Sequence, residues 1–226
     1  MFEMLTVPQS AEFNPLLFEF DAEKQVVGDT EMINQVTGLP CTSIDLTVAG
    51  QSGYTNEVIN HATYGQVFSL SGNRLFVAND ILLPPSLATN KAIIYEITFQ
   101  STGSGQMFCT GGSVQGAWRV GFVVTRGLSN FTVQLVESSS GGSATTSTIA
   151  TSANMQKLIA STSGSNIFKA LVEDGTGVCG PYTLTWSRFT RLCMFCTMAA
   201  AEGNQTTRQM YGHLKSVRVY IGDPLP

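Results

Sequence analysis

Few residues in this sequence combine the side-chain types and the spacing that catalysis requires. A glycoside hydrolase needs two carboxyl groups that flank the scissile bond, roughly 5–10 Å apart. Glu96 is the only carboxylate in its apolar run, and Glu137 and the Glu173–Asp174 pair fall at the predicted ends of strands. Because no predicted strand carries a suitable pair, the sequence disfavours a glycosidase.

The other nucleophiles and bases form no recognisable catalytic motif. The chain has two histidines, His61 and His213, and it contains no Gly-x-Ser-x-Gly turn, phosphate-binding loop or dinucleotide-binding motif. His213 lies beside Lys215 in a strand-like segment, and we expect its ring to face solvent. These observations predict a protein that is not an enzyme.

The cysteines do not predict a metal or redox site. There are five of them, Cys41, Cys109, Cys179, Cys193 and Cys196. An odd number argues against a disulfide framework. Cys193 and Cys196 have the spacing of a ligand or redox pair, but they lie in an apolar strand-like run, and no second pair stands at a suitable spacing for zinc. We therefore expect core-packed thiols, and neither a metal ion nor a cofactor.

Two tyrosines are the best candidates for binding a sugar. Tyr54 and Tyr64 lie in polar, loop-like sequence, where an aromatic ring can remain accessible. Trp118 and Trp186 instead follow the period of neighbouring apolar residues, which predicts that they pack in the core. The sequence therefore suggests Tyr54 and Tyr64 as glycan-binding residues.

The composition favours assembly with other subunits. Charged residues make up 12% of the 226 residues, about half of the typical ~25%. A surface of Ser, Thr, Asn, Gln and Gly suits contacts between subunits, although a soluble monomer with a neutral surface is the alternative. The net charge is −4 without a basic run, and no apolar stretch reaches membrane-spanning length. We expect no nucleic-acid binding and no membrane insertion.

The first 15 residues resemble an arm rather than part of the domain. They contain two prolines and scattered apolar residues without a sustained period. Exposed apolar groups of this kind must dock on their own domain or on a neighbour. We predict an extended assembly arm over residues 1–15, with a domain over residues 16–226 and with contacts through Phe2, Met4, Leu5 and Phe13. No basic and apolar leader opens the chain, so we expect synthesis in a cytoplasm.

Short strands with turn signals between them account for most of the remaining sequence. The strongest covers residues 92–99, and the last covers 209–221, where Leu214, Val217 and Val219 alternate with polar residues apart from a slip at Ser216. Residues 51–61 read as a loop, and 153–160 as the one plausible helix. Residues 138–152 are either a mobile loop or a polar strand pair at a rim. This pattern predicts an all-β fold, a two-sheet antiparallel sandwich or jelly roll.

The order of these motifs resembles that of laminin G-like domains. The matching segments are residues 17–21, 67–75, 93–99, 107–112, 117–122 and 212–220. The resemblance implies a concanavalin A-like lectin/glucanase jelly roll, as found in bacteriophage virion proteins, which meets its ligands on a concave sheet or on rim loops. The paired carboxylates of the glucanase branch are missing, and the isolated pairs Asn79–Asp80 and Glu173–Asp174 do not predict a Ca²⁺ site.

The leading hypothesis is a non-enzymatic structural protein of a virion. It would decorate a capsid, or form part of a surface or tail, and its partners would be copies of itself and other virion proteins. A host surface polysaccharide would be a further partner if the protein also mediates attachment. The alternative is a carbohydrate-binding, lectin-like module for glycan recognition.

Overall fold

The fold is built almost entirely from antiparallel strands. In a computed structural model of the chain, the described residues are 16–45, 56–71, 74–78, 88–101, 105–111, 121–126, 130–136, 144–150, 154–163, 167–173, 178–183, 191–194 and 211–226. They contain one short 3₁₀ turn, η1 (Ala22–Lys24), and no α-helix. None of their helical segments could span a membrane.

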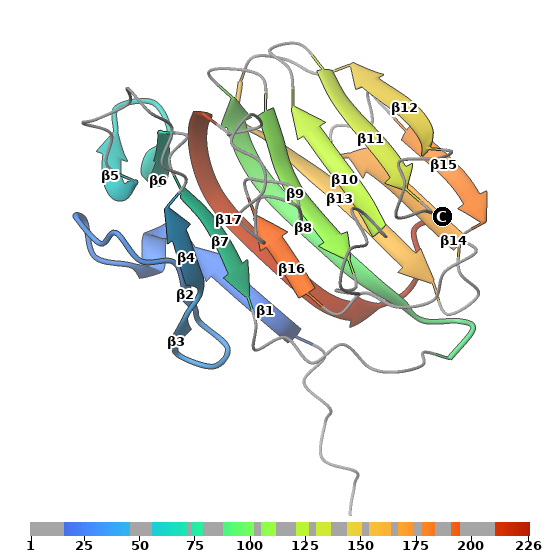
Figure 1. Cartoon of the computed structure of the whole chain (residues 1–226), viewed down its shortest axis with the longest axis horizontal. Helices are drawn as coiled ribbons and strands as arrows, with labels where there is room; N and C mark the ends of the chain where they lie inside the picture. Colours follow the sequence, from blue (N-terminus) through green and yellow to red (C-terminus); the bar gives the residue numbers. More distant parts are fainter. Residues whose placement is uncertain are drawn as a thin grey trace, which may run out of the picture.

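Two large sheets are stacked on one another (Figure 1). The eight-stranded sheet has the spatial order β15 (Val178–Thr183), β14 (Ile167–Val172), β13 (Gln156–Ser163), β8 (Ala92–Ser101), β17 (Tyr211–Gly222), β6 (Gly65–Ser71) and β5 (Glu57–His61), with β1 (Leu16–Asp21) also paired to β17. Figure 1 shows the β5–β6 hairpin at the left end of the molecule.

The second large sheet has seven strands. Its order is β12 (Ala144–Ala150), β11 (Asn130–Val136), β10 (Gly121–Arg126), β9 (Gly105–Gly111), β16 (Arg191–Met194), β7 (Arg74–Ala78) and β4 (Thr42–Asp45). A small ribbon of β2 (Ile33–Asn34) and β3 (Leu39–Pro40) lies beside β1. The predicted all-β fold, a two-sheet antiparallel sandwich, is confirmed.

The hydrophobic core lies between the two sheets. On β8 the residues Ile93, Tyr95, Ile97 and Phe99 are all buried in it, because alternate residues of a strand share one face. Phe68 of β6 packs edge-on against Phe20 of the same sheet and Phe76 of the other, with ring centroids 5.8 and 5.4 Å apart. The opposite faces of β8, β17, β6, β5 and β13 form what we call the outward face.

The slip in the alternation of β17 is a β-bulge. Leu214 pairs with Phe99 of β8, and Ser216 pairs with the next residue, Thr98, so Lys215 has no partner opposite it. The other edge of β17 also changes partner at this point, from β6 (up to Leu214) to β1 (from Ser216). The extra residue restores the pattern, which is why Leu214 and Val217 are both buried in the core.

Two predictions from local sequence are wrong. The expected helix at residues 153–160 overlaps strand β13, which pairs with β8 and β14 and buries Leu158 and Ala160 in the core. The expected loop at 51–61 ends in strand β5, which pairs with β6. Pairing with neighbouring strands outweighs the weak local preferences of both segments. Of the two alternatives for residues 138–152, the rim strand fits, since β12 ends the seven-stranded sheet and pairs with β11.

Gly180 is a position where we expect a methyl group to be poorly tolerated. Its φ is +97°, and a Cβ there would lie 2.6 Å from the backbone oxygen of Phe168. The conformation alone costs an L-residue roughly 1–2 kcal/mol, and the contact with rigid backbone adds to this. Gly28 has a φ of +96° with nothing within 4 Å of such a Cβ, so it supplies a matched control.

Urea denaturation of Gly180→Ala and Gly28→Ala therefore separates the cost of the positive φ, which both positions share, from the cost of the close contact with Phe168, which only Gly180 has. We expect Gly180→Ala to lose at least about 2 kcal/mol of unfolding free energy, and Gly28→Ala to lose about 1 kcal/mol. Equal losses in the two variants would show that the close approach of β14 and β15 at Phe168 has no energetic consequence.

Candidate site: a histidine–tyrosine cluster on the outward face

Strand alternation directs a group of polar and aromatic side chains outward near the β5–β6 hairpin. Leu214 of β17 and Phe99 of β8 point into the core, so their neighbours His213 and Gln100 lie on the outward face. Tyr64 belongs to the turn between β5 and β6, directly before Gly65, whose φ is +71°. The tight hairpin thus brings Tyr64 close to His213 of β17.

The rings of His61, Tyr64 and His213 contact one another there. His61 and Tyr64 are stacked, with centroids 4.7 Å apart and planes inclined by 19°. His213 lies tilted against His61 at 4.5 Å, and 6.3 Å from Tyr64. Nδ1 of His213 is 2.9 Å from Oε1 of Gln100. We call these four residues the histidine–tyrosine cluster; its three rings are all partly accessible to solvent.

Hydrogen bonds bear on the neutral tautomers of both histidines. The backbone N–H of Thr63 donates to Nδ1 of His61 over 3.1 Å, so the proton of neutral His61 is on Nε2. In the tautomer of His213 that donates from Nδ1 to Oε1 of Gln100, its Nε2 keeps a lone pair. The two imidazoles together therefore supply a ring donor and a ring acceptor, which is the combination that a sugar hydroxyl can use.

His213 lies on the outward face, where it is half-buried. Burial, and secondarily the charge of the neighbouring His61, lower the pKa of His213 below its usual value. The imidazole is therefore neutral at pH 7. The rings of His61 and Tyr64, from the β5–β6 hairpin, cover part of His213 on this face.

We expect the stability of the fold to fall as the pH is lowered from 7 to 5, in part through His213. Its folded-state pKa lies below the unfolded value of about 6.5, so the unfolded chain takes up the proton first. Stability is consequently lost as the pH falls from about 6.5 through the folded pKa. Urea denaturation at both pH values should show a smaller loss for His213→Gln than for the wild type. Identical losses would contradict this role.

A belt of ion pairs crosses the middle of the outward face. Its members, in order across the sheet, are Lys24, Glu19, Arg218, Tyr220, Glu96, Lys157 and Glu173. Glu96 accepts a hydrogen bond from the Tyr220 hydroxyl over 2.8 Å and pairs with Nζ of Lys157 at 3.2 Å. Burial and then the Glu96 contact raise the pKa of Tyr220 to about 12. The belt is thus a satisfied network of opposite charges.

The belt does not provide the carboxylate pair of a glycosidase. Lys157 binds Glu173 at 3.2 Å as well as Glu96, so its ammonium stands between the two carboxylates. In a hydrolase the scissile glycosidic bond would have to occupy that space. Glu96 and Glu173 are therefore held by a shared lysine and do not flank an open space.

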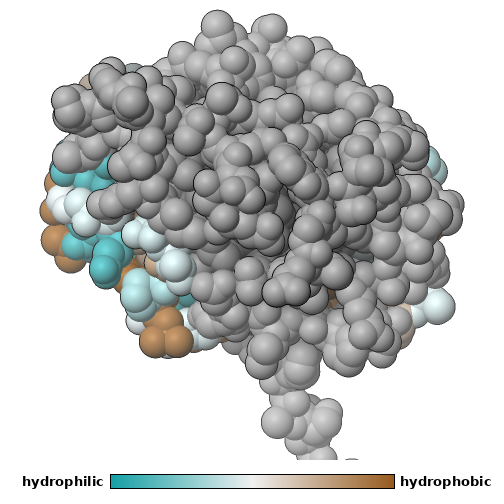
Figure 2. Space-filling view, in the orientation of Figure 1, coloured by the Kyte–Doolittle hydropathy of each residue, from teal (hydrophilic) through white to brown (hydrophobic). Residues whose placement is uncertain are grey.

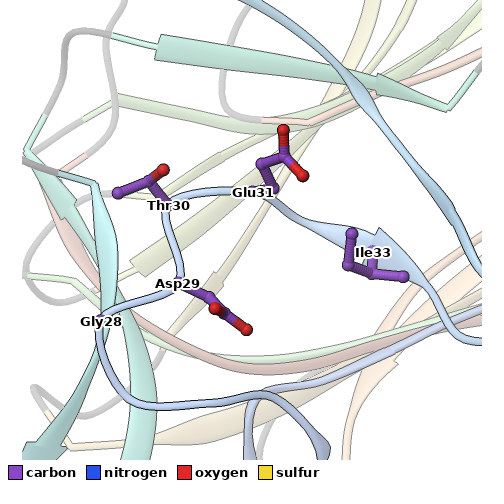
Figure 3. A pocket seen from close by; sticks show the side chains of 5 residues that line it. All are labelled: Gly28, Asp29, Thr30, Glu31 and Ile33. Atoms are coloured by element: carbon purple, nitrogen blue, oxygen red, sulfur yellow. The ribbon is translucent and has the colours of Figure 1, made fainter.

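An open pocket of about 390 Å³ shares no described residue with the cluster and is lined by Gly28, Asp29, Thr30, Glu31 and Ile33. Figure 3 shows the carboxyl groups of Asp29 and Glu31 pointing away from each other. Oδ2 of Asp29 accepts the backbone N–H of Val26 over 3.0 Å, which closes the local turn. Among the described residues no three His, Cys, Asp or Glu side chains gather as a metal site. None of the described residues that line the pocket is aromatic, so they offer a sugar no ring on which to stack.

Apolar side chains are exposed around η1 and the β2–β3 ribbon. They are Val26, Val27, Val36 and Leu39. Figure 2 shows hydrophobic residues beside hydrophilic ones on this side of the molecule. Val26 and Leu39 expose 71% and 55% of their surface, which is unusual for aliphatic side chains. We call this group the apolar edge; a contact with another chain would remove it from water.

The structure brings one of the two predicted glycan-binding residues into the cluster. Tyr64 is part of it, whereas Tyr54 lies outside the described residues. The predicted arm residues Phe2, Met4, Leu5 and Phe13 also lie outside them. His61 and His213 were not predicted as binding residues. His61 ends a segment that reads as a loop and His213 stands in a strand-like one, and only the pairing of distant strands brings the two together.

Similar folds occur among solved structures. Comparison with protein-family models and with curated proteins finds no match. A chain of botulinum neurotoxin type C, whose cell entry depends on interaction with two ganglioside molecules, matches with a TM-score of 0.55 at 9% identity, covering 94% of this chain and 49% of that one. The receptor-binding domain of botulinum neurotoxin D matches with a TM-score of 0.53 at 8% identity, covering 94% and 50%. This chain has a lectin-like β-sandwich fold.

Another similar structure is the CBM40 module of a Ruminococcus gnavus IT-sialidase, bound to α2,3-sialyllactose. It matches with a TM-score of 0.44 at 11% identity, covering 59% of this chain and 76% of that one. The chain spans about half the length of the neurotoxin chains that it matches. None of these three structures is a virion protein, so the phage part of the sequence resemblance stays a prediction.

Proposed function

We propose that this chain is a carbohydrate-binding, lectin-like module and that the histidine–tyrosine cluster is its sugar site. The observation that carries the proposal is the contact of three partly accessible rings on the outward face, next to the amide of Gln100. Aromatic rings give a sugar an apolar surface, and a few polar groups around them fix its orientation. A neurotoxin C chain, whose cell entry depends on gangliosides, has a similar fold, and this supports a glycan as the ligand but does not support one charge class of glycan over another.

The module is proposed to bind sugars without hydrolysing them. Glu96 is held by Tyr220 and Lys157, and the nearest carboxylate along the belt, Glu173, shares the same lysine. Incubation with a bound disaccharide should leave it intact. Release of monosaccharide that depends on Glu96 would contradict this part of the proposal.

A glycan array with the purified chain is the first test. We expect binding to a limited set of glycans, and we expect the same set to be lost when Tyr64 is replaced. An array without any signal, together with the absence of chemical-shift changes at millimolar lactose, would reject the carbohydrate-binding function.

A structural role in a virion remains a second proposal. The apolar edge formed by Val26, Val27, Val36 and Leu39 favours contact with another copy of the chain, and the low share of charged residues, 12%, suits such contacts. A surface protein of a virion can also bind host polysaccharide, so the two proposals are compatible. Co-purification of the protein with virus particles tests this role, and its absence from them would reject it.

A further inference from the structure

Lys215 is the described cation that reaches the histidine–tyrosine cluster. Its Nζ donates to the backbone oxygen of Tyr64 over 3.1 Å and to that of Gln66 over 3.3 Å. It also forms an ion pair with Oε1 of Glu23. An ammonium group has three N–H donors, and these three acceptors use all of them. Lys215 therefore has no N–H donor left for a ligand, although its Nζ contacts the backbone of Tyr64.

The position of Lys215 in the sheet explains why it meets Glu23 and the β5–β6 turn. Lys215 is the extra residue of the bulge, at the point where β17 changes its partner from β6 to β1. η1, which carries Glu23, follows β1 and packs against β6 and β17. Gly65 lies beside this ion pair. A Cβ at that position would lie 3.6 Å from Nζ of Lys215 and 3.9 Å from Oε1 of Glu23.

Arg218 and Lys24, two further described cations of this side of the sheet, are engaged elsewhere. Arg218 interacts with Glu19 at 3.5 Å and lies over the ring of Tyr220, with 5.8 Å between its guanidinium carbon and the centroid. Lys24 pairs with Glu19 as well, at 2.7 Å. His213 is neutral at pH 7, as shown by its environment. Among the described residues, the lysines and the arginine named here thus have acidic partners, and the cluster offers mainly rings and hydrogen-bonding groups.

We infer that the cluster selects neutral sugars over acidic ones, and that Glu23 sets this selectivity by neutralising Lys215. The inference rests on the proposed function and names its ligand class: a hexose with an apolar face, such as galactose in lactose. A sialic acid carboxylate would need a charge-assisted hydrogen bond to compensate its loss of water. With Glu23 in place, Lys215 cannot supply that bond.

The test compares lactose with 3′-sialyllactose at pH 7.5 and low salt, by titration of the full chain in NMR or calorimetry. We expect the wild type to bind 3′-sialyllactose at least about tenfold more weakly than lactose. Glu23→Gln should raise the affinity for 3′-sialyllactose about five- to tenfold and change that for lactose less than about twofold. The side chain of Glu23 is 60% exposed, so the substitution should leave the fold intact.

Two further variants test whether the released charge of Lys215 causes the gain in affinity for 3′-sialyllactose. Glu31→Gln removes the same charge from an exposed residue of the acidic pocket, outside the cluster, and should leave both affinities unchanged. Glu23→Gln combined with Lys215→Gln should lose the affinity gained for 3′-sialyllactose. A wild type that binds 3′-sialyllactose as tightly as lactose, or a Glu23→Gln variant with unchanged preference, overturns the selectivity inference alone. If neither glycan binds at millimolar concentration and the glycan array is also silent, the proposed function fails with it.

Discussion

Replacing Phe68 by alanine is expected to lower the free energy of unfolding by about 3–5 kcal/mol. The side chain is fully buried, and its ring packs edge-on against Phe20 of β1 and Phe76 of β7. Because β1 and β7 belong to different sheets, truncation leaves a cavity where the two layers meet. Neither sheet can collapse into that cavity without shifting its strands against the other.

Urea denaturation of Phe68→Ala, Phe68→Leu and Tyr64→Ala measures this effect. Leucine keeps most of the buried volume, so we expect its loss to be about half that of alanine. Tyr64 lies at the partly accessible hairpin turn, and Tyr64→Ala should lose less than about 1 kcal/mol. Similar losses at positions 64 and 68 would contradict the placement of Phe68 at the centre of the core.

The second large effect is on binding: Tyr64→Ala should weaken lactose affinity at least about tenfold, which corresponds to 1.4 kcal/mol. The Tyr64 ring stacks on His61 with 4.7 Å between centroids, so its removal takes away the apolar platform and leaves His61 less constrained. Tyr64→Phe keeps the ring and should remain within about threefold of the wild type.

Calorimetric titration with lactose measures these affinities, and Tyr220→Ala is the matched control. Tyr220 is an aromatic residue of the same outward face, but it belongs to the belt through its hydrogen bond to Glu96. We expect lactose affinity within about twofold of the wild type for Tyr220→Ala. A larger loss at position 220 than at 64 would move the sugar site from the cluster to the belt.

Much of the sheet architecture could be predicted because strand periodicity is a local signal. The alternation of Leu214, Val217 and Val219 correctly indicated which side of β17 is buried. The slip at Ser216 already marked the position of the bulge, since one extra residue shifts the pattern by one. Polar residues in β5 gave a misleading signal, because a strand paired on one side only can present them to water.

The histidine–tyrosine cluster could be predicted only in part. Tyr64 was recognisable as an aromatic residue in polar turn sequence. The partnership of His61 and His213 depends on β6 lying between β5 and β17 in the sheet, and no local pattern encodes the order of strands. The neutralisation of Lys215 by Glu23 was hidden for the same reason, since these residues meet only where β17 changes its partner.

The most direct test of the carbohydrate site is an aromatic ¹H–¹³C NMR titration of the wild-type chain with lactose. Signals of Tyr64, His61 and His213 should shift together with a single affinity, because their rings contact one another. The ring of Phe68 in the core and that of Tyr220 in the belt should serve as unshifted references. Lactose binding that moves Tyr220 and leaves Tyr64 and His213 unchanged, or saturating lactose that moves none of them, would contradict the account.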